Sequence, residues 1–248
     1  MPLDSIAGIE IAALRRIMTE AAAASRDLLK APAGATPLMQ ADRDIKLGED
    51  RSSEALIVAA LQARSPFPIL SEEAGWIGDV PAHDAPYWAV DPLDGSFNHH
   101  RGVPLCCTSV ALCRGLVPLA GAVFDFNRDE TYWGGRELGL LLNDRPVAPR
   151  PPAADIITTG FPVGGDFSAS GIASVVERAQ AWKKIRMIGS AALSLAWVAS
   201  GRFDTYEETG TRWWDVAGGL ALVEGAGGRI AVSGGNALDK LAVRADRC

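Results

Sequence analysis

The stretch Trp88-Ala-Val-Asp-Pro-Leu-Asp-Gly-Ser-Phe-Asn98 holds the densest acidic chemistry of the chain. Its apolar start is typical of a short buried strand, which would bring Asp91 to the strand end. Pro92 has no backbone N–H and favours a turn. Asp94 follows three residues after Asp91, so both carboxylates can face one point.

The two residues after Asp94 extend this interpretation. Gly95 permits a close approach of the backbone, and Ser96 can open a helix whose first N–H groups bind an anion such as phosphate. Two close carboxylates repel each other unless a cation lies between them, and oxygen ligands favour Mg²⁺, Mn²⁺ or Ca²⁺ over zinc. Taken alone, a stretch of this kind is more often an acidic turn without a ligand than a metal site.

Two other segments place acids at the ends of apolar elements. In Pro68-Ile-Leu-Ser-Glu-Glu73 a short strand ends in paired acids, so Glu72 or Glu73 can join the same cluster at the carboxyl edge of a sheet, where ligand sites are common. In Trp213-Trp-Asp-Val-Ala-Gly218, Asp215 lies in the first turn of an apolar helix. There a carboxylate is either an N-terminal cap or a ligand.

The rest of the chain predicts mixed helices and strands of the α+β class. We expect helices over 5–30, 49–64, 168–181, 190–200 and 215–225, and strands over 67–70, 87–90, 106–113, 119–126, 130–133, 156–159, 184–188, 204–207, 229–232 and 238–243, with a loop over 71–86. Three prolines in positions 149–152 predict a boundary between an N-terminal α+β domain, 1–148, and a C-terminal α/β domain, 149–248. The first would carry the metal-binding motif and the second would complete the site.

Composition limits the function classes. The 248 residues are 48% hydrophobic, and 24 Lys and Arg against 30 Asp and Glu give a net charge of −6. With no basic run, nucleic-acid binding is disfavoured. No apolar stretch approaches the length of about 20 residues that spans a bilayer, and the N-terminus lacks signal-peptide features. We therefore expect a cytoplasmic protein with no membrane partner, whose four cysteines are reduced core thiols.

Together, these segments resemble the inositol monophosphatase family of metal-dependent phosphatases. The family's Asp-Pro-Ile/Leu-Asp-Gly-Thr motif matches 91–96, and its Trp-Asp-x-Ala-Gly motif matches 214–218 with the acidic, glycine-rich 224–228 after it. Its Glu-Glu pair matches 72–73, and the likeness runs from about Asp44 to Val232. The resemblance implies a layered αβαβα sandwich, a homodimer and two to three Mg²⁺ ions in each active site.

The resemblance also implies residue roles. Glu72, Asp91 and the Leu93 carbonyl resemble the ligands of the first metal, and Asp91, Asp94 and Asp215 those of the second. The implied catalytic residues are Glu72 and Ser96, which would orient a water for in-line attack. Asp50 resembles the acid near a third metal, with a helix N-terminal charge as the alternative. The implied substrate contacts are Asp94, Gly95, Ser96, Gly189, Ser190, Ala191, Glu208 and Asp215.

Three features depart from the family pattern. Ser96 stands where Thr is usual, which keeps the hydroxyl but loses the β-branch that fixes χ1. His99 and His100 replace apolar residues, and we interpret them as surface or substrate-rim side chains. After Val232 only 16 residues remain, whereas family members usually finish with a further strand and a helix.

We expect a Mg²⁺-dependent phosphomonoesterase acting on inositol monophosphate or a related sugar or polyol phosphate. The first alternative is a 3′(2′),5′-bisphosphate nucleotidase acting on 3′-phosphoadenosine 5′-phosphate. It is disfavoured because Phe97-Asn98 replaces that branch's Lys-Glu-Phe. Fructose 1,6-bisphosphate and histidinol phosphate stay open as substrates. The second alternative, a non-catalytic binding module with the same fold, is disfavoured by the complete set of motif acids.

Overall fold

The computed structural model describes residues 4–30, 39–41, 44–46, 48–148, 151, 153–160 and 167–247. Its larger sheet has the strand order β12-β11-β10-β9-β8-β7-β5-β6. Only β5 and β7 pair in parallel, and the other neighbours are antiparallel. The strands are β5 (Ile69–Ser71), β6 (Gly75–Ile77), β7 (Pro86–Asp94), β8 (Cys107–Arg114), β9 (Val117–Asp125), β10 (Glu130–Gly135), β11 (Gly139–Leu142) and β12 (Arg145–Pro146).

The smaller sheet has the order β14-β13-β15-β17-β16. Its first three strands are parallel, and β17 runs antiparallel to both β15 and β16. The strands are β13 (Ile156–Thr158), β14 (Lys184–Arg186), β15 (Thr205–Thr211), β16 (Arg229–Ser233) and β17 (Leu241–Asp246). Two short hairpins complete the strands: β1 (Ser5–Ile6) with β2 (Ile9–Glu10), and β3 (Met39–Ala41) with β4 (Asp44–Lys46).

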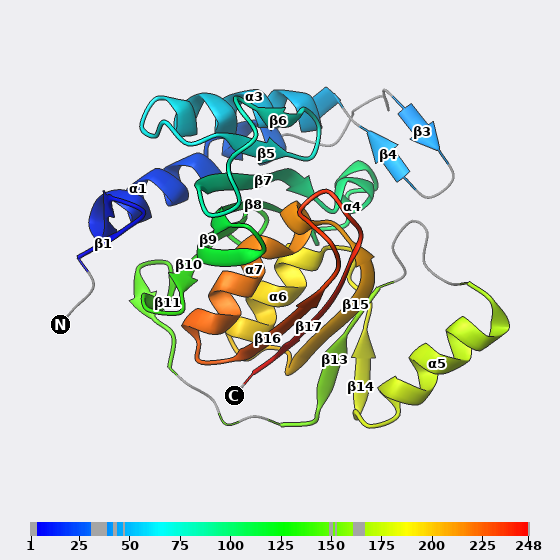
Figure 1. The fold of residues 1–248 in the computed structure, drawn as a ribbon. Coiled ribbons are helices and arrows are strands. Elements are labelled where there is room, and N and C mark those ends of the chain that lie inside the picture. The colour runs from blue at the N-terminus through cyan, green and yellow to red at the C-terminus, as the bar shows by residue number, and fades with distance from the viewer. Residues whose placement is uncertain are drawn as a thin grey trace.

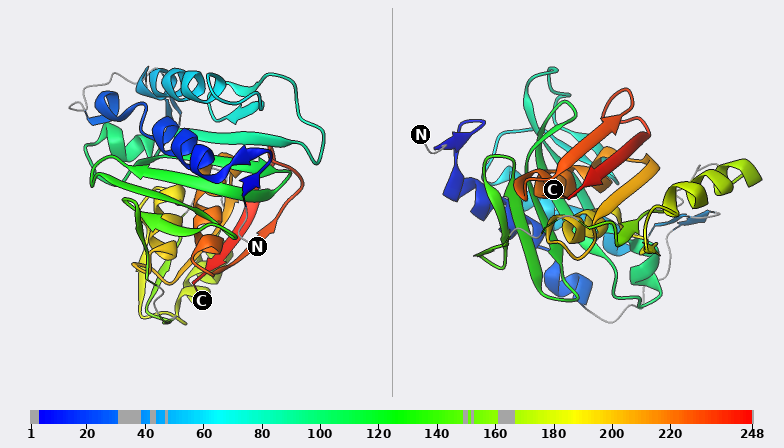
Figure 2. Two further views of the ribbon diagram at one scale, coloured as in Figure 1. Left: turned by 90° about the vertical axis from the view of Figure 1, so that its left-hand side faces the viewer. Right: turned by 90° about the horizontal axis from the view of Figure 1, so that it is seen from below.

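Helices and sheets alternate in layers (Figures 1 and 2). Helices α1 (Ile11–Ala22) and α3 (Gly48–Gln62) cover the outer face of the larger sheet, and α6 (Ala191–Ala199) and α7 (Trp213–Gly225) fill the space between the two sheets. The short helices α2 (Arg26–Lys30) and α4 (Ser96–His100) flank the larger sheet, and α5 (Ala169–Ala179) lies beyond β14. This arrangement confirms the predicted layered sandwich.

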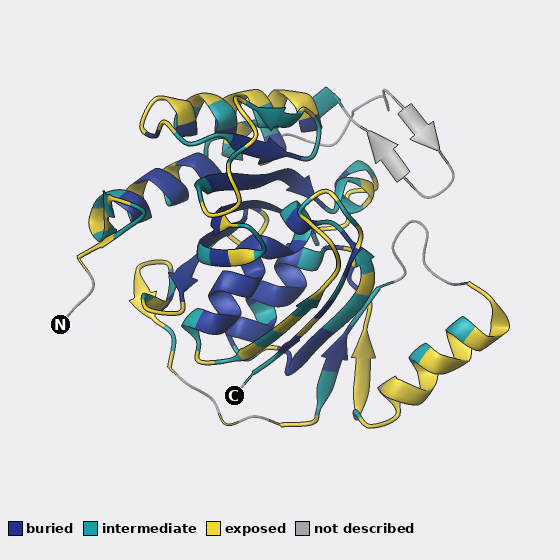
Figure 3. Cartoon of the chain, in the orientation of Figure 1, coloured by how far each residue is buried: buried dark blue, intermediate teal, exposed yellow. Residues whose placement is uncertain are grey.

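The central helices are almost wholly buried (Figure 3). Two glycines let α7 lie directly on the larger sheet. A Cβ on Gly218 would stand 2.4 Å from the Ser109 Oγ, and one on Gly121 of β9 would stand 2.1 Å from the Gly218 carbonyl oxygen. Since no side chain separates helix and sheet there, the first turn of α7 comes close to the end of β7.

The N-terminal prediction of one helix over 5–30 is wrong. The β1–β2 hairpin comes first, because Ala7 and Gly8 adopt positive φ of 51° and 80° and turn the chain. The Glu10 carboxylate then accepts from the N–H groups of Ala12 and Ala13 and starts α1. Three turn residues separate α1 from α2. An apolar repeat every third or fourth residue predicts a helix, but it does not show where a turn or a cap interrupts that helix.

The other differences are smaller. The segment 71–86, expected to be a loop, contains the strand β6. Strands β11 and β12 were not predicted. The last strand lies at Leu241–Asp246 rather than at 238–243. The larger sheet ends at Pro146 and the smaller begins at Ile156, yet one buried core joins residues of both around α6 and α7. The domain division at 148/149 therefore stays a prediction.

Cys106, Cys107 and Cys113 are free and buried. Within the described residues, no helix has the length and apolarity needed to cross a membrane.

Candidate active site

Three predicted acids meet at the end of the larger sheet. Glu72, Asp91 and Asp215 each offer a carboxylate oxygen, and these oxygens all lie within 4.8 Å of one another. Glu72 follows β5, and Asp91 lies on β7, which pairs with β5 in parallel. Asp215 comes from the first turn of α7. Parallel pairing and the close packing of α7 thus bring together residues that are far apart in the sequence.

The electrostatics of this cluster are unbalanced, because burial and mutual repulsion act against the charged forms of Asp91 and Asp215. Burial raises the pKa of Asp91 well above its ordinary value, and repulsion from Glu72, Asp94 and Asp215 raises it further. Burial and repulsion from Glu72 and Asp94 do the same to the pKa of Asp215. Carboxylates held this close are stable in their charged form when a cation lies among them, and an all-oxygen donor set fits Mg²⁺. The residues present therefore fit the implied metal.

This imbalance predicts a pH-dependent effect of Mg²⁺ on stability. A raised folded-state pKa stabilises the fold below about pH 4, the unfolded value, and that contribution is lost as pH rises through the folded values, about 6 for Asp94. In EDTA, the melting temperature should therefore be lower at pH 8 than at pH 5.5. Added Mg²⁺ should raise it more at pH 8, because protons no longer compete for the carboxylates. An equal Mg²⁺ shift in calorimetry at both pH values would contradict this.

Asp215 takes part in the cap of α7 and also belongs to the acidic cluster. Its Oδ2 accepts a hydrogen bond of 2.9 Å from the backbone N–H of Arg212, the residue before α7. The same side chain is a member of the acidic cluster. The cap holds the carboxylate at a fixed orientation toward Glu72 and Asp91.

Asp94 takes a different position from the one its spacing suggested. Its Oδ2 accepts hydrogen bonds of 2.6 Å from the Ser190 hydroxyl and 2.6 Å from the Ala192 N–H, at the start of α6. It is not a member of the three-carboxylate group found among the described residues. Ser190 is 4% exposed. Its hydroxyl donates to Asp94 and accepts from the Leu193 N–H, which caps α6. The predicted substrate contacts Gly189, Ser190 and Ala191 thus form the turn that holds Asp94.

Ser96 lies beside the cluster with two acceptors in reach. Its hydroxyl is 2.9 Å from the Leu93 carbonyl oxygen and 3.3 Å from the Asp50 Oδ1. Asp50 is 3% exposed on α3, 46 positions away in the sequence. The Leu93 N–H in turn donates to Asp91 Oδ1 over 3.0 Å. One hydrogen-bonded turn therefore connects Asp91, Leu93, Ser96 and Asp50.

Gly95 and Asn98 hold this turn against the rest of the protein. Gly95 has φ of 91°, and a Cβ there would stand 2.9 Å from the Leu105 carbonyl oxygen, so only glycine fits. The Asn98 amide donates to the carbonyls of Leu105 and Ile188, each over 2.7 Å. Asn98 thereby fixes the turn that precedes α6 and indirectly Asp94. Nothing in its spacing predicts this positioning role.

Glu208, an implied substrate contact, belongs to a strand rather than to a loop. It lies on β15, and burial raises its pKa to about 7. A Cβ on Gly160 would stand 2.8 Å from both of its carboxylate oxygens, so Gly160 leaves the space that the carboxylate occupies. Repulsion between Glu208 and Asp215 raises the pKa of Asp215. Glu208 thus stands at the margin of the acidic cluster.

The interpretation of His99 as a surface residue is wrong. His99 is 7% exposed and lies edge-on to Phe126, with ring centroids 6.0 Å apart. Burial lowers its pKa, so it is a neutral core side chain. His100 is half-buried.

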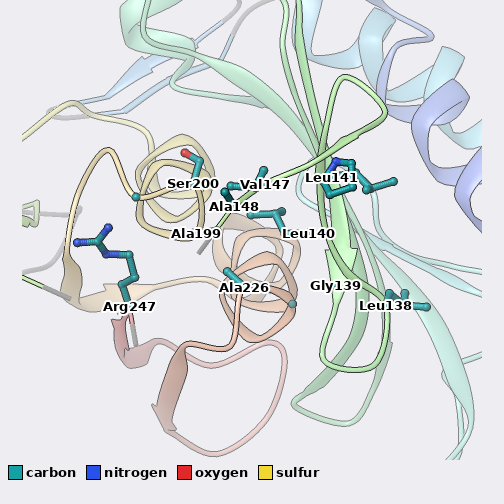
Figure 4. Close-up of a pocket in the computed structure, with 13 residues that line it drawn as sticks. Leu138, Gly139, Leu140, Leu141, Val147, Ala148, Ala199, Ser200, Ala226 and Arg247 are labelled. Atoms are coloured by element: carbon teal, nitrogen blue, oxygen red, sulfur yellow. The ribbon is translucent and has the colours of Figure 1, made fainter. Parts of the chain in front are cut away.

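A pocket of about 290 Å³ lies at the far ends of α6 and α7 (Figure 4). It is lined by Leu140, Ala199, Ala226 and Arg247 among others, and none of the cluster's acids line it.

Comparison with known proteins gives one consistent result. A model of the inositol monophosphatase family matches residues 5–247. An inositol-1-monophosphatase of Synechocystis is 34% identical over 79% of this chain and 69% of that protein. A Nus factor SuhB of Xylella fastidiosa is 39% identical over 73% of this chain and 66% of its own length. The solved structure of an inositol monophosphatase from Anabaena matches with a TM-score of 0.78 and 30% identity, covering 94% of this chain and 90% of that one. The chain therefore belongs to the inositol monophosphatase family.

Proposed function

We propose that this protein is a Mg²⁺-dependent phosphomonoesterase that hydrolyses inositol monophosphate or a related sugar or polyol phosphate. The observation that carries the proposal is the group formed by the buried Asp91 and the half-buried Glu72 and Asp215, with the Ser96–Asp50 pair beside it. Such a set needs a cation and offers a hydroxyl close to where the cation would be held. The family membership supports the same reaction class.

In this proposal, Glu72, Asp91 and the Leu93 carbonyl hold one ion, and Asp91, Asp94 and Asp215 hold a second, with two to three ions in total. Bound Mg²⁺ neutralises the phosphate ester, lowers the pKa of a water and stabilises the leaving oxygen. The protein's part is to fix these ligands, through the Arg212 N–H on Asp215 and the start of α6 on Asp94.

The chain's own proton chemistry involves Ser96 and Glu72. When the Ser96 hydroxyl donates its proton toward Asp50 Oδ1, its lone pairs are free to accept a hydrogen bond from the attacking water. Glu72, a member of the cluster, orients the same water or accepts its proton. Both groups then aim the water at phosphorus in line with the leaving oxygen.

The direct test is a panel of esters assayed for released phosphate with Mg²⁺. Inositol 1-phosphate, a hexose phosphate and 3′-phosphoadenosine 5′-phosphate represent the polyol and nucleotidase hypotheses. We expect turnover of the polyol esters and its loss in EDTA. Phosphate release that survives EDTA would refute the metal assignment. No release from any ester would leave the fold with a non-catalytic role.

Glu208 gives a test of the polyol. A carboxylate that accepts hydrogen bonds from substrate hydroxyls should lose about 1–2 kcal/mol on Glu208→Gln, or about tenfold in kcat/KM for inositol or sugar phosphates. p-Nitrophenyl phosphate offers no such hydroxyl and should be hydrolysed equally by variant and parent. Equal losses on both substrates would mean that Glu208 acts on the cluster or the fold instead.

We also propose a homodimer, supported by an uncovered apolar surface. Ile172 and Val176 of α5 are 42% and 49% exposed, and Ile185 of β14 is 41% exposed. β14 is an edge strand of the smaller sheet, and exposed edges of this kind are commonly covered. Sedimentation of the native chain should therefore give the mass of two chains.

A further inference from the structure

The largest of the pockets described lies beside Glu208, between α5, β15 and the turn that joins β16 to β17. It has a volume of about 810 Å³. Glu208 and Gly160 line it, and β15, which carries Glu208, ends at Thr211, two residues before α7 begins with Asp215 in its first turn. The pocket therefore lies along the strand that leads to the acidic cluster, next to the leaving group of a phosphate ester bound as proposed above. Pockets of about 300–1,000 Å³ enclose drug-sized molecules, so this one exceeds the needs of one six-membered ring.

Hydroxyl groups from several elements line this pocket, together with glycine, apolar and charged residues. Five Ser or Thr side chains from three elements and the segment after β13 line it: Thr159, Ser170, Ser174, Thr209 and Ser233. Each hydroxyl can donate one hydrogen bond and accept others. Among the described lining residues there is no aromatic ring on which a nucleobase could stack. The lining thus suits a molecule that carries many hydroxyls of its own.

The charged groups of the wall largely compensate one another. The Arg178 Nε is 2.8 Å from Glu207 Oε1, and its NH1 donates to the Ser174 Oγ over 2.6 Å. The other oxygen of Glu207 is 2.8 Å from Arg244. Lys240 also lines the pocket and, like Arg178, already has a partner. A second phosphate on the substrate would therefore meet two cations that have partners, with two glutamates nearby. This arrangement favours neutral hydroxyls over another anion.

We propose that the leaving group of the substrate is a glycosylated polyol of two rings, whose second ring lies in this pocket between α5 and β15. This inference rests on the proposed phosphatase function and names its substrate class. The reacting phosphate and the first ring would lie at the acidic cluster and Glu208. The second ring would contact the hydroxyls of Ser170 and Ser174 on one wall and Thr209 on the other. Contacts of this remote part contribute to kcat/KM.

The test compares esters that differ only in the remote ring. We expect kcat/KM for a disaccharide phosphate, such as trehalose 6-phosphate, to be about tenfold above that for glucose 6-phosphate, the gain that one or two net hydrogen bonds provide. Ser174→Trp should fill the pocket and remove this advantage while leaving glucose 6-phosphate and p-nitrophenyl phosphate unchanged. Thr209→Trp, from the opposite wall, should do the same if the first variant folds poorly. Glu177→Trp is the matched control, because Glu177 lies on α5 but does not line the pocket.

Two outcomes would overturn the inference. One is an equal or lower kcat/KM for the disaccharide phosphate, and the other is a preference for fructose 1,6-bisphosphate that Ser174→Trp removes. Calorimetric binding of the two sugar phosphates to Ser96→Ala, which keeps the proposed metal ligands and should turn over slowly, gives a second readout that does not depend on turnover. Preferential disaccharide binding there would support the pocket even if no ester were hydrolysed. Failure of the proposed phosphatase function would appear separately, as no phosphate release from p-nitrophenyl phosphate.

Discussion

Replacing Asp91 by Asn should reduce phosphate release to background while the fold survives. Asp91 is 2% exposed and lies in the centre of the acidic cluster, where it is proposed to bind both ions. The amide is a weaker, neutral ligand, so both ions would be lost together. Its oxygen can still accept the Leu93 N–H, and one source of carboxylate repulsion is removed. In EDTA at pH 8 the melting temperature of the variant should therefore equal or exceed that of the parent.

Assays at increasing Mg²⁺ concentration, with a melting curve of each protein, check this prediction. Glu73→Gln is the control, because Glu73 is adjacent to Glu72 in the sequence but is not a member of the cluster. It should keep most of the parent's activity. An active Asp91→Asn protein would show that the cluster does not hold the catalytic metal. A variant that fails to fold would show that the carboxylate stabilises the chain without metal.

Ser96→Ala should lower kcat by about 10²-fold or more, the usual scale of a general acid–base contribution, with little change in KM. The reason is the position of the hydroxyl between the Leu93 carbonyl and Asp50, from which it can orient the attacking water. Ser96→Thr keeps the hydroxyl and adds the β-branch that restricts χ1, so this variant should keep or raise the rate.

Ser53→Ala separates orientation of the water from support of the turn. The Ser53 hydroxyl is buried on α3 and donates to the Pro92 carbonyl over 2.9 Å, so it supports the same turn through a different carbonyl from the one that Ser96 contacts. We expect it to cost stability and little kcat. If both alanine variants lose kcat equally, the Ser96 hydroxyl only holds the turn. If Ser96→Ala keeps the full rate, the hydroxyl has no part in the reaction.

Much of the site was predictable because its acids come at the ends of strongly patterned elements. An apolar strand before Asp91, another before Glu72 and an apolar helix after Asp215 place three carboxylates at element ends. The motifs that carry these carboxylates follow one another in the order and spacing of a known family. They therefore also identified the family and the layered sandwich. These features depend on local pattern, which a sequence carries directly.

Other residues acquired their positions from contacts between distant segments. Asp50 meets Ser96 because α3 packs on the sheet over the β7 end, and Asn98 reaches the Ile188 carbonyl across the start of α6. Glu208 is half-buried and has a raised pKa because it lies on an interior strand of the smaller sheet. The spacing of residues in the sequence does not predict these contacts between distant segments, because each contact depends on how sheets and helices pack.

The sequence by itself determined which residue types stand at the ends of β5 and β7 and at the start of α7, and therefore the family, the fold class and the acidic character of the site. Only the tertiary structure decided where each carboxylate points. Asp94 turns toward the N–H of Ala192 and the hydroxyl of Ser190, whereas Asp91 faces Glu72 and Asp215. The physical reason is that a carboxylate follows the strongest donors within its reach, and those donors are supplied by a helix start almost a hundred residues away, which only folding brings near.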